Sequence, residues 1–206
     1  MKITVVGTGY VGLVTGTCFA ETGNNVICVD IDHAKVDKLS TGQITIYEPG
    51  LEKIFLKNQK DDRLTFTTSL SEGIKNAQVI FLALPTPPGE NGSADLKYIL
   101  GVAKELGVLI QAGDYKVIID KSTVPVGTAE KVRQTLLSNG GIEGTFDIVS
   151  NPEFLREGVA VDDFMKPDRV VIGTSSEKAK KILSDLYAPL FAKATPLFLW
   201  TKKVRS

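Results

Sequence analysis

Three glycines near the N-terminus have the spacing of a site for phosphate groups. Gly7, Gly9 and Gly12 directly follow the apolar run Ile3–Val6 and directly precede a stretch with helical period. In such a motif the first glycine turns the chain, the second lets a pyrophosphate approach the backbone, and the third lets the helix pack on the strand. The free N–H groups at the start of the helix then face the phosphates. This turn is a candidate dinucleotide site, with contacts expected from Gly7, Gly9, Tyr10, Val11 and Gly12.

An acidic residue ends the next apolar run, Val26–Val29. Asp30 follows Gly12 at close to the spacing of about 20 residues at which a carboxylate accepts hydrogen bonds from the adenosine ribose. Because a carboxylate there repels a 2′-phosphate, the expected cofactor is NAD rather than NADP. The alternative is that Asp30 only caps the following turn. Asp32 is expected to be the N-cap of the next helix.

Short apolar runs rich in β-branched residues alternate with longer stretches of helical period. Because the runs are continuously apolar, they are typical of strands covered on both faces. The sequence therefore predicts an α/β fold of the Rossmann type, a doubly wound, mostly parallel sheet with helices on both faces. Six parallel strands are expected, at Ile3–Val6, Val26–Val29, Val79–Leu84, Val117–Ile119, Phe146–Val149 and Val170–Ile172. The expected helices are Val11–Thr22, Ala34–Leu39, Leu96–Gln111, Thr128–Ser138 and Glu177–Leu186.

The composition argues against several classes of function. Basic and acidic residues balance at 24 each, so no net charge draws the chain to nucleic acid or to anionic lipid. No apolar run approaches the roughly 18 residues that cross a bilayer, and the N-terminus lacks the apolar region of a signal peptide. The two cysteines, Cys18 and Cys28, are expected to be reduced and buried, which favours the cytoplasm. His33 is expected at the exposed start of a helix, and no metal site is expected.

Six different short motifs are spaced along most of the chain. They are Gly7–Leu13, Glu48–Leu51, Thr86–Pro88 with Gly92–Leu96, Lys121–Thr128, Asn151–Gly158 and Pro167–Gly173. In order and spacing they resemble the N-terminal domain of the UDP-glucose/GDP-mannose dehydrogenase family, up to about Pro196. Any one of these motifs is weak evidence for the family. Six of them in the family's order make coincidence a poor explanation.

The resemblance implies an NAD-dependent enzyme that oxidises the C6 alcohol of a nucleotide sugar to a carboxylate. In the family, two hydride transfers consume two NAD per UDP-glucose, pass through a cysteine-bound thiohemiacetal and thioester, and yield UDP-glucuronate. The motifs Pro87–Asp95 and Lys121–Thr128 are more similar to UDP-glucose than to GDP-mannose enzymes. Another nucleotide sugar, GDP-mannose or a UDP-N-acetylhexosamine, stays open as the substrate.

The resemblance also implies two catalytic side chains. Glu153 corresponds to the glutamate that activates water for thioester hydrolysis, a general-base task that suits a carboxylate. Thr123, just beyond the Val117–Ile119 run, corresponds to a residue that holds a water and the cofactor near the reacting carbon. As an alternative, Ser122 and Thr123 simply cap the helix that begins near Val126.

Further positions correspond to binding contacts in the family. Lys35 and Thr86 match cofactor contacts, although Lys35 also suits a solvated helix face. Glu157 matches a contact at the nicotinamide end, and it shares a face with Glu153 if that segment is helical. The alternative is an exposed turn that bears two glutamates. The residues expected along the sugar-nucleotide pocket are Glu153, Phe154, Leu155, Arg156 and Glu157.

The family chain continues beyond the last motif with parts that have no counterpart here. These are a central helix with a catalytic lysine and asparagine, through which full-length relatives form homodimers, and a C-terminal UDP-sugar domain with the nucleophilic cysteine. The expected organisation is therefore an NAD-binding domain over residues 1–200 and a frayed tail over 201–206. Without a thiol for the covalent intermediate, the chain is expected to be inactive alone. A non-catalytic NAD-binding module is the alternative from another class.

Overall fold

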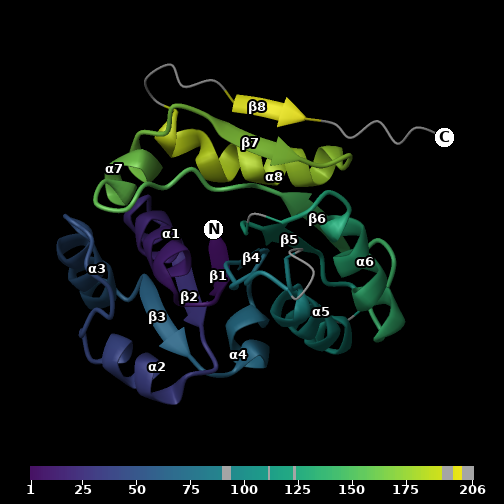
Figure 1. Cartoon of the computed structure of the whole chain (residues 1–206), viewed down its shortest axis with the longest axis horizontal. Helices are drawn as coiled ribbons and strands as arrows, with labels where there is room; N and C mark the ends of the chain where they lie inside the picture. Colours follow the sequence, from purple (N-terminus) through teal and green to yellow (C-terminus); the bar gives the residue numbers. More distant parts are fainter. Residues whose placement is uncertain (90–93, 111, 123, 192–196, 201–206) are drawn as a thin grey trace.

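One sheet runs through the chain. The structure is a computed structural model that describes residues 1–89, 94–110, 112–122, 124–191 and 197–200. Within these residues eight strands follow the order β3-β2-β1-β4-β5-β6-β7-β8 (Figure 1). They are β1 (Lys2–Val6), β2 (Asn25–Val29), β3 (Leu64–Thr67), β4 (Val79–Leu82), β5 (Lys116–Asp120), β6 (Phe146–Ser150), β7 (Val170–Gly173) and β8 (Leu197–Trp200).

The strand order reverses at β1, which lies between β2 and β4. Neighbouring strands are parallel except β6 and β7, which pair antiparallel. Val6, the last residue of β1, pairs with Val29 on one side and Leu82 on the other. The Gly-rich turn and Asp30 therefore leave the sheet at the same edge. In doubly wound sheets this edge, at the point of reversal, forms the ligand crevice.

Helices cover both faces of the sheet. They are α1 (Tyr10–Glu21), α2 (His33–Ser40), α3 (Leu51–Lys60), α4 (Leu70–Ile74), α5 (Lys97–Leu109), α6 (Thr128–Ser138), α7 (Ala160–Met165) and α8 (Glu177–Tyr187), with a 3-10 turn at Ala188–Leu190. One core cluster packs strand residues against α1, α3, α7 and α8, and the other packs them against α4, α5 and α6 (Figure 1). Phe19 joins the layers of the first cluster, because its ring centroid lies 5.0 Å from that of Phe81 and 4.9 Å from that of Phe164.

The predicted Rossmann-type fold is confirmed, and so are all predicted strands, with corrections. The prediction of six parallel strands was wrong in number, because β3 and β8 complete the sheet, and in direction, because β7 runs antiparallel to β6. The fourth strand ends at Leu82 rather than Leu84. Ala83 N–H still donates to Val6 O, but the chain then reaches Pro85, which has no N–H for a ladder.

The predicted helices are confirmed within two residues at each described end, and Thr128–Ser138 matches at both ends. Gln111, the predicted end of one helix, lies outside the described residues. Asp32 is the N-cap of α2 as expected, since its side chain accepts from Lys35 N–H at 3.0 Å. Helices α3, α4 and α7 were not predicted from the sequence. Leu51, Phe55 and Asn58 of α3 are buried, so its apolar face is narrow.

The predicted tail at 201–206 lies outside the described residues. None of the helices that the structure describes is long and apolar enough to cross a membrane. Across the same residues, no three His, Cys, Asp or Glu side chains gather as they would around a metal ion.

Candidate functional site

Two glycines of the turn after β1 are required by backbone contacts. Gly7 has φ of +99°, a conformation that favours glycine, and a Cβ there would lie 2.4 Å from the carbonyl oxygen of Ala83. A Cβ on Gly12 would lie 1.9 Å from the carbonyl oxygen of Gly7. The first turn of α1 therefore packs directly on the Gly-rich turn, and only a hydrogen at position 12 permits it.

Gly9 is different, because the space beside it is open. A Cβ on Gly9 would meet no atom of the described residues within 4 Å, and the φ of −67° at Gly9 is accessible to any residue. Gly9 is the N-cap of α1, and neither a capping side chain nor an acidic residue occupies the first turn. The N–H groups there remain available to an anion, and no side chain keeps it at a distance.

Asp30 lies beside this turn and is held by four donors. Its Oδ2 accepts from Thr8 N–H at 2.9 Å, from Thr8 Oγ1 at 2.6 Å and from Lys35 Nζ at 3.2 Å, while Oδ1 accepts from Asp32 N–H at 3.1 Å. Burial alone would raise the pKa of Asp30, but these hydrogen bonds hold it below its ordinary value. The carboxylate is therefore charged at neutral pH. It caps the following turn, and its Oδ1 still has acceptor capacity for a ligand hydroxyl.

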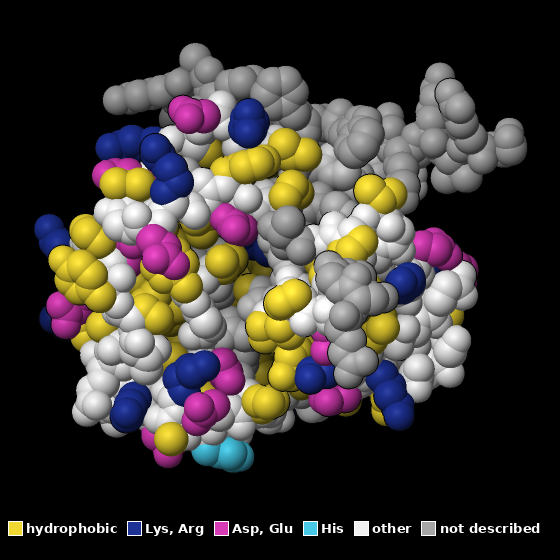
Figure 2. Space-filling model, in the orientation of Figure 1, with side chains coloured by type: hydrophobic (Ala, Val, Ile, Leu, Met, Phe, Trp, Pro, Cys, Tyr) yellow, Lys and Arg dark blue, Asp and Glu magenta, His cyan; other side chains and the backbone are white. Residues whose placement is uncertain are grey.

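A cavity of about 800 Å³ opens along the turn and Asp30. Figure 2 shows a hollow near the middle of the molecular face that it draws, with hydrophobic side chains along it. Of the predicted cofactor contacts, the cavity brings together Gly7, Gly9, Tyr10, Val11, Asp30, Lys35 and Thr86. Gly12 and Glu157 are not among its lining residues, and Thr123 lies outside the described residues.

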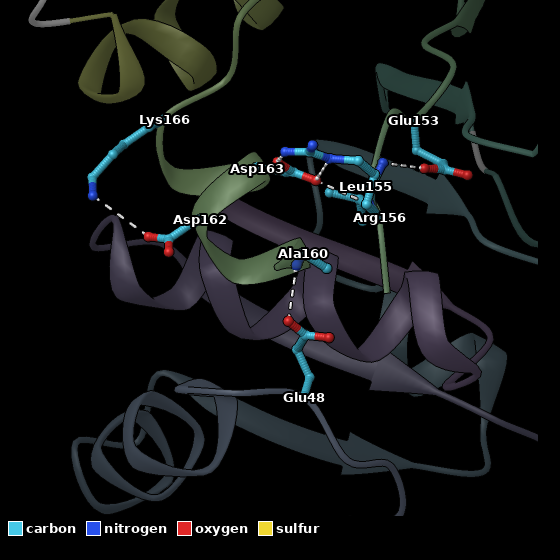
Figure 3. A network of polar contacts seen from close by, with 8 residues as sticks. All are labelled: Glu48, Glu153, Leu155, Arg156, Ala160, Asp162, Asp163 and Lys166. Atoms are coloured by element: carbon cyan, nitrogen blue, oxygen red, sulfur yellow. Dashed lines mark hydrogen bonds and ion pairs between the residues drawn. The ribbon is translucent and has the colours of Figure 1, made fainter. Parts of the chain in front are cut away.

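The segment between β6 and α7 carries the predicted catalytic glutamate. It is not helical before Ala160, so the condition under which Glu153 and Glu157 would share a helical face is not met. Pro152 has no N–H for a helix, and the Glu153 carboxylate accepts from Leu155 N–H at 2.6 Å, which forms a tight local turn (Figure 3). Glu153 lines the large cavity, whereas Glu157 is exposed.

A second cavity of about 400 Å³ lies on the other side of Glu153. The predicted substrate contacts Phe154, Leu155 and Arg156 line it, and the guanidinium of Arg169 lies 4.5 Å from the centroid of the Phe154 ring. Arg156 is held by Asp163, with Nη2 2.6 Å from Oδ1 (Figure 3). Among the residues that the structure describes, only Lys121 and Glu153 line both cavities, so the two cavities meet at a buried cation and a carboxylate.

Lys121 lies in one of the sequence motifs, but no role was predicted for its side chain. This side chain is buried, and its Nζ donates to Asn151 Oδ1 at 3.4 Å, an oxygen that also accepts from Tyr187 Oη at 2.5 Å. Burial lowers the pKa of Lys121 to about 8, and the negative charge of Glu153 opposes that shift. A lysine directly after a buried strand, at the carboxyl edge of a sheet, was the signal available in the sequence.

We expect Lys121→Met to raise the free energy of unfolding at neutral pH by on the order of 2 kcal/mol. The fold lowers the pKa of Lys121 from 10.5 to about 8, so between these values the folded chain binds fewer protons than the unfolded chain. The cost of burying the charge is therefore full below pH 8 and fades as the pH rises toward 10.5.

Urea unfolding of both proteins at neutral pH and at about pH 10 measures this difference. Lys53→Met, at an exposed position of α3, is the matched control. A Lys121→Met protein that is less stable than the parent at neutral pH would contradict the expectation.

Other candidate residues have structural surroundings. Ser122 does not cap α6, whose N-cap is Gly127; its Oγ donates instead to Leu84 O at 2.8 Å. Cys18 and Cys28 are buried as predicted, and burial raises the pKa of both thiols. His33, the cyan side chain in Figure 2, is exposed at the start of α2, as expected.

The fold and the larger cavity define an NAD-binding Rossmann domain. An open Gly9, available N–H groups at the start of α1 and a charged Asp30 fit the pyrophosphate and ribose of that cofactor. The chain belongs to the UDP-glucose/GDP-mannose dehydrogenase family, because residues 1–191 match the model of the family's NAD-binding domain.

Sequence similarity to named relatives supports this family membership. The chain is 49% identical over 191 residues to UDP-glucose 6-dehydrogenase TuaD of Bacillus subtilis, covering 93% of this chain and 41% of the relative. It is 51% identical over 193 residues to the UDP-glucose 6-dehydrogenase of Pseudomonas aeruginosa, covering 92% and 42%. The chain thus spans less than half the length of these relatives.

Solved structures give the same result. A ternary complex of GDP-mannose dehydrogenase from Pseudomonas aeruginosa superimposes with a TM-score of 0.93 at 33% identity, over 99% of this chain and 47% of the other. A UDP-glucose dehydrogenase from Pyrobaculum islandicum gives 0.90 at 40% identity, over 97% and 46%. Both likenesses cover almost all of this chain.

Proposed function

We propose that this chain supplies the NAD site and one side of the sugar site of an enzyme that oxidises UDP-glucose to UDP-glucuronate. The observation that carries the proposal is the meeting of the two cavities at Lys121 and Glu153. An oxidation by NAD needs the nicotinamide and the reacting carbon side by side, so a cofactor cavity must open into a substrate cavity. When bound, NAD accepts the hydride that leaves C6 in each of two oxidations.

In this proposal the smaller cavity binds the nucleotide sugar. Arg156, Lys166 and Arg169 line it together with Lys121, and such cations suit a diphosphate. Phe154 and Leu155 add apolar side chains to the same wall. The acidic side chains in this wall leave the cavity with mixed charge, and Asp163 holds Arg156 in place.

Glu153 is the general base of the proposed reaction. Its carboxylate takes a proton from water as the oxygen attacks a thioester carbonyl, the sulfur leaves as thiolate, and the sugar carboxylate forms. The thiol comes from another part of the enzyme, since Cys18 and Cys28 are buried in the core. The assignments of Thr123 and Glu157 stay predictions.

The test is NADH formation by an enzyme that contains this chain and a C-terminal half like that of its relatives. With UDP-glucose we expect two NADH per sugar and a kcat/KM about 100-fold above those for GDP-mannose and UDP-N-acetylhexosamines. The sequence identity to UDP-glucose 6-dehydrogenases supports UDP-glucose as the preferred substrate. The structural similarity to a GDP-mannose dehydrogenase favours GDP-mannose as the second candidate. A higher kcat/KM for GDP-mannose would reverse the assignment, and NAD binding without turnover of any sugar would leave only a binding module.

A further inference from the structure

A buried carboxylate joins three segments that are far apart in the sequence. Glu48, in the loop before α3, is 4% exposed. Its Oε2 accepts from Tyr10 Oη and from Gly158 N–H at 2.8 Å, and its Oε1 accepts from Ala160 N–H at 2.8 Å. Figure 3 shows the carboxylate pointing toward the first turn of α7. More than 100 residues separate Glu48 from both amides.

Hydrogen bonds alone balance the charge of this carboxylate within the described residues, where it forms no ion pair. Burial would raise the pKa of Glu48, but the Tyr10 hydroxyl and the amides of Gly158, Ala160 and Val161 hold it below its ordinary value. Val159, the N-cap of α7, forms no capping hydrogen bond of its own. Glu48 therefore serves as the cap of α7 from a distant segment, which makes its position and that of α7 interdependent.

The hydrogen-bond partners of Glu48 differ in their relation to the two cavities. Tyr10 is the first residue of α1, follows Gly9 directly and lines the larger cavity. Gly158 and Ala160 line neither cavity, but they end the segment that carries Glu153. Glu48 lines neither cavity itself, so any effect on the site passes through its partners.

We propose that Glu48 is a positioning residue that couples cofactor binding at the Gly-rich turn to the placement of the Glu153 segment. The proposal rests on the proposed function, since it takes NAD as the ligand of the larger cavity. A ligand that restrains Tyr10 restrains the Glu48 carboxylate, and the carboxylate in turn fixes the amides at the start of α7. The free energy of this coupling is carried by the hydrogen bonds to this buried carboxylate.

The test is amide hydrogen exchange of the chain with and without saturating NAD, read at Gly158 and Ala160. These amides touch neither cavity, so their protection reports the connection rather than the ligand. In the parent protein we expect NAD to slow their exchange by about fivefold or more. In Tyr10→Phe, which keeps the ring and the cap of α7 but removes the hydroxyl link, we expect NAD to slow it by less than about twofold.

Tyr47→Phe is the matched control, because it is the same change at an exposed side chain next to Glu48. Glu48→Gln replaces one acceptor oxygen by a donor, so the amides of Gly158 and Ala160 should exchange faster even without NAD. The control Glu52→Gln, at an exposed position, should leave the exchange of these amides unchanged. Calorimetry on the same samples measures NAD binding. No NAD binding by the parent overturns the proposed function and the coupling with it. Binding with unchanged exchange, or equal protection in Tyr10→Phe and Tyr47→Phe, overturns the coupling alone.

Discussion

Replacing Glu153 by glutamine in the complete enzyme is expected to lower kcat by a factor of about 10² to 10⁴, the usual contribution of a general base. Glutamine keeps the size of the side chain and still accepts from Leu155 N–H, so the local turn survives. It cannot take a proton from water. NAD affinity should stay within about twofold of the parent, because the proposed cofactor contacts at Gly9 and Asp30 are untouched.

The time course of NADH distinguishes which step has failed. If only hydrolysis is blocked, both hydride transfers still occur, and the variant should release a burst of up to two NADH per site before it stalls. Rapid-mixing absorbance measures the burst, and Glu157→Gln reports whether the second glutamate, which lines neither cavity, also matters. Turnover by Glu153→Gln at the parent rate would contradict the proposed role of Glu153.

Two alanine substitutions in the Gly-rich turn should both weaken NAD binding but should differ in their effect on stability. Gly9→Ala adds a methyl group into open space with an accessible φ, so stability should change by less than about 1 kcal/mol. The same methyl group occupies the cavity side where a pyrophosphate must approach, so NAD affinity should fall about 100-fold. Gly12→Ala instead drives a Cβ to 1.9 Å from Gly7 O, and backbone must move.

For Gly12→Ala we therefore expect a loss of about 3 kcal/mol in the free energy of unfolding together with weaker NAD binding. Denaturant unfolding and calorimetric titration of both variants measure the two properties separately. A Gly9→Ala protein that binds NAD as tightly as the parent would place the pyrophosphate elsewhere. A Gly12→Ala protein of unchanged stability would contradict the packing of α1 on the turn.

The parts of the fold that the sequence predicted are those with a strong local pattern. The strands β1, β2, β4 and β5 are covered on both faces, so most side chains in them are apolar and their central apolar runs are easily recognised. The edge strand β3, Leu64–Thr67, has only one fully buried side chain and two threonines, and no such run marks it. The short helices α4 and α7 are too brief for a helical period to be recognised.

In the candidate site too, the residues that could be predicted are those in a local sequence pattern. Gly7, Gly9 and Asp30 could be predicted because their spacing along one βαβ unit fixes their place at the edge of the sheet. Lys121 and Glu48 were assigned no role, because most of their surroundings come from segments that the sequence does not place next to them. Glu48 in particular meets Gly158 only in the folded chain.

The most direct measurement is a crystal structure of this chain with NAD bound. We expect the dinucleotide in the larger cavity, with its pyrophosphate at Gly9, its adenosine ribose at Asp30 and its nicotinamide ring at the end that Lys121 and Glu153 share with the smaller cavity. NAD bound outside that cavity, or with the nicotinamide ring remote from Glu153, would contradict the assignment of this chain as one half of a sugar-oxidising site.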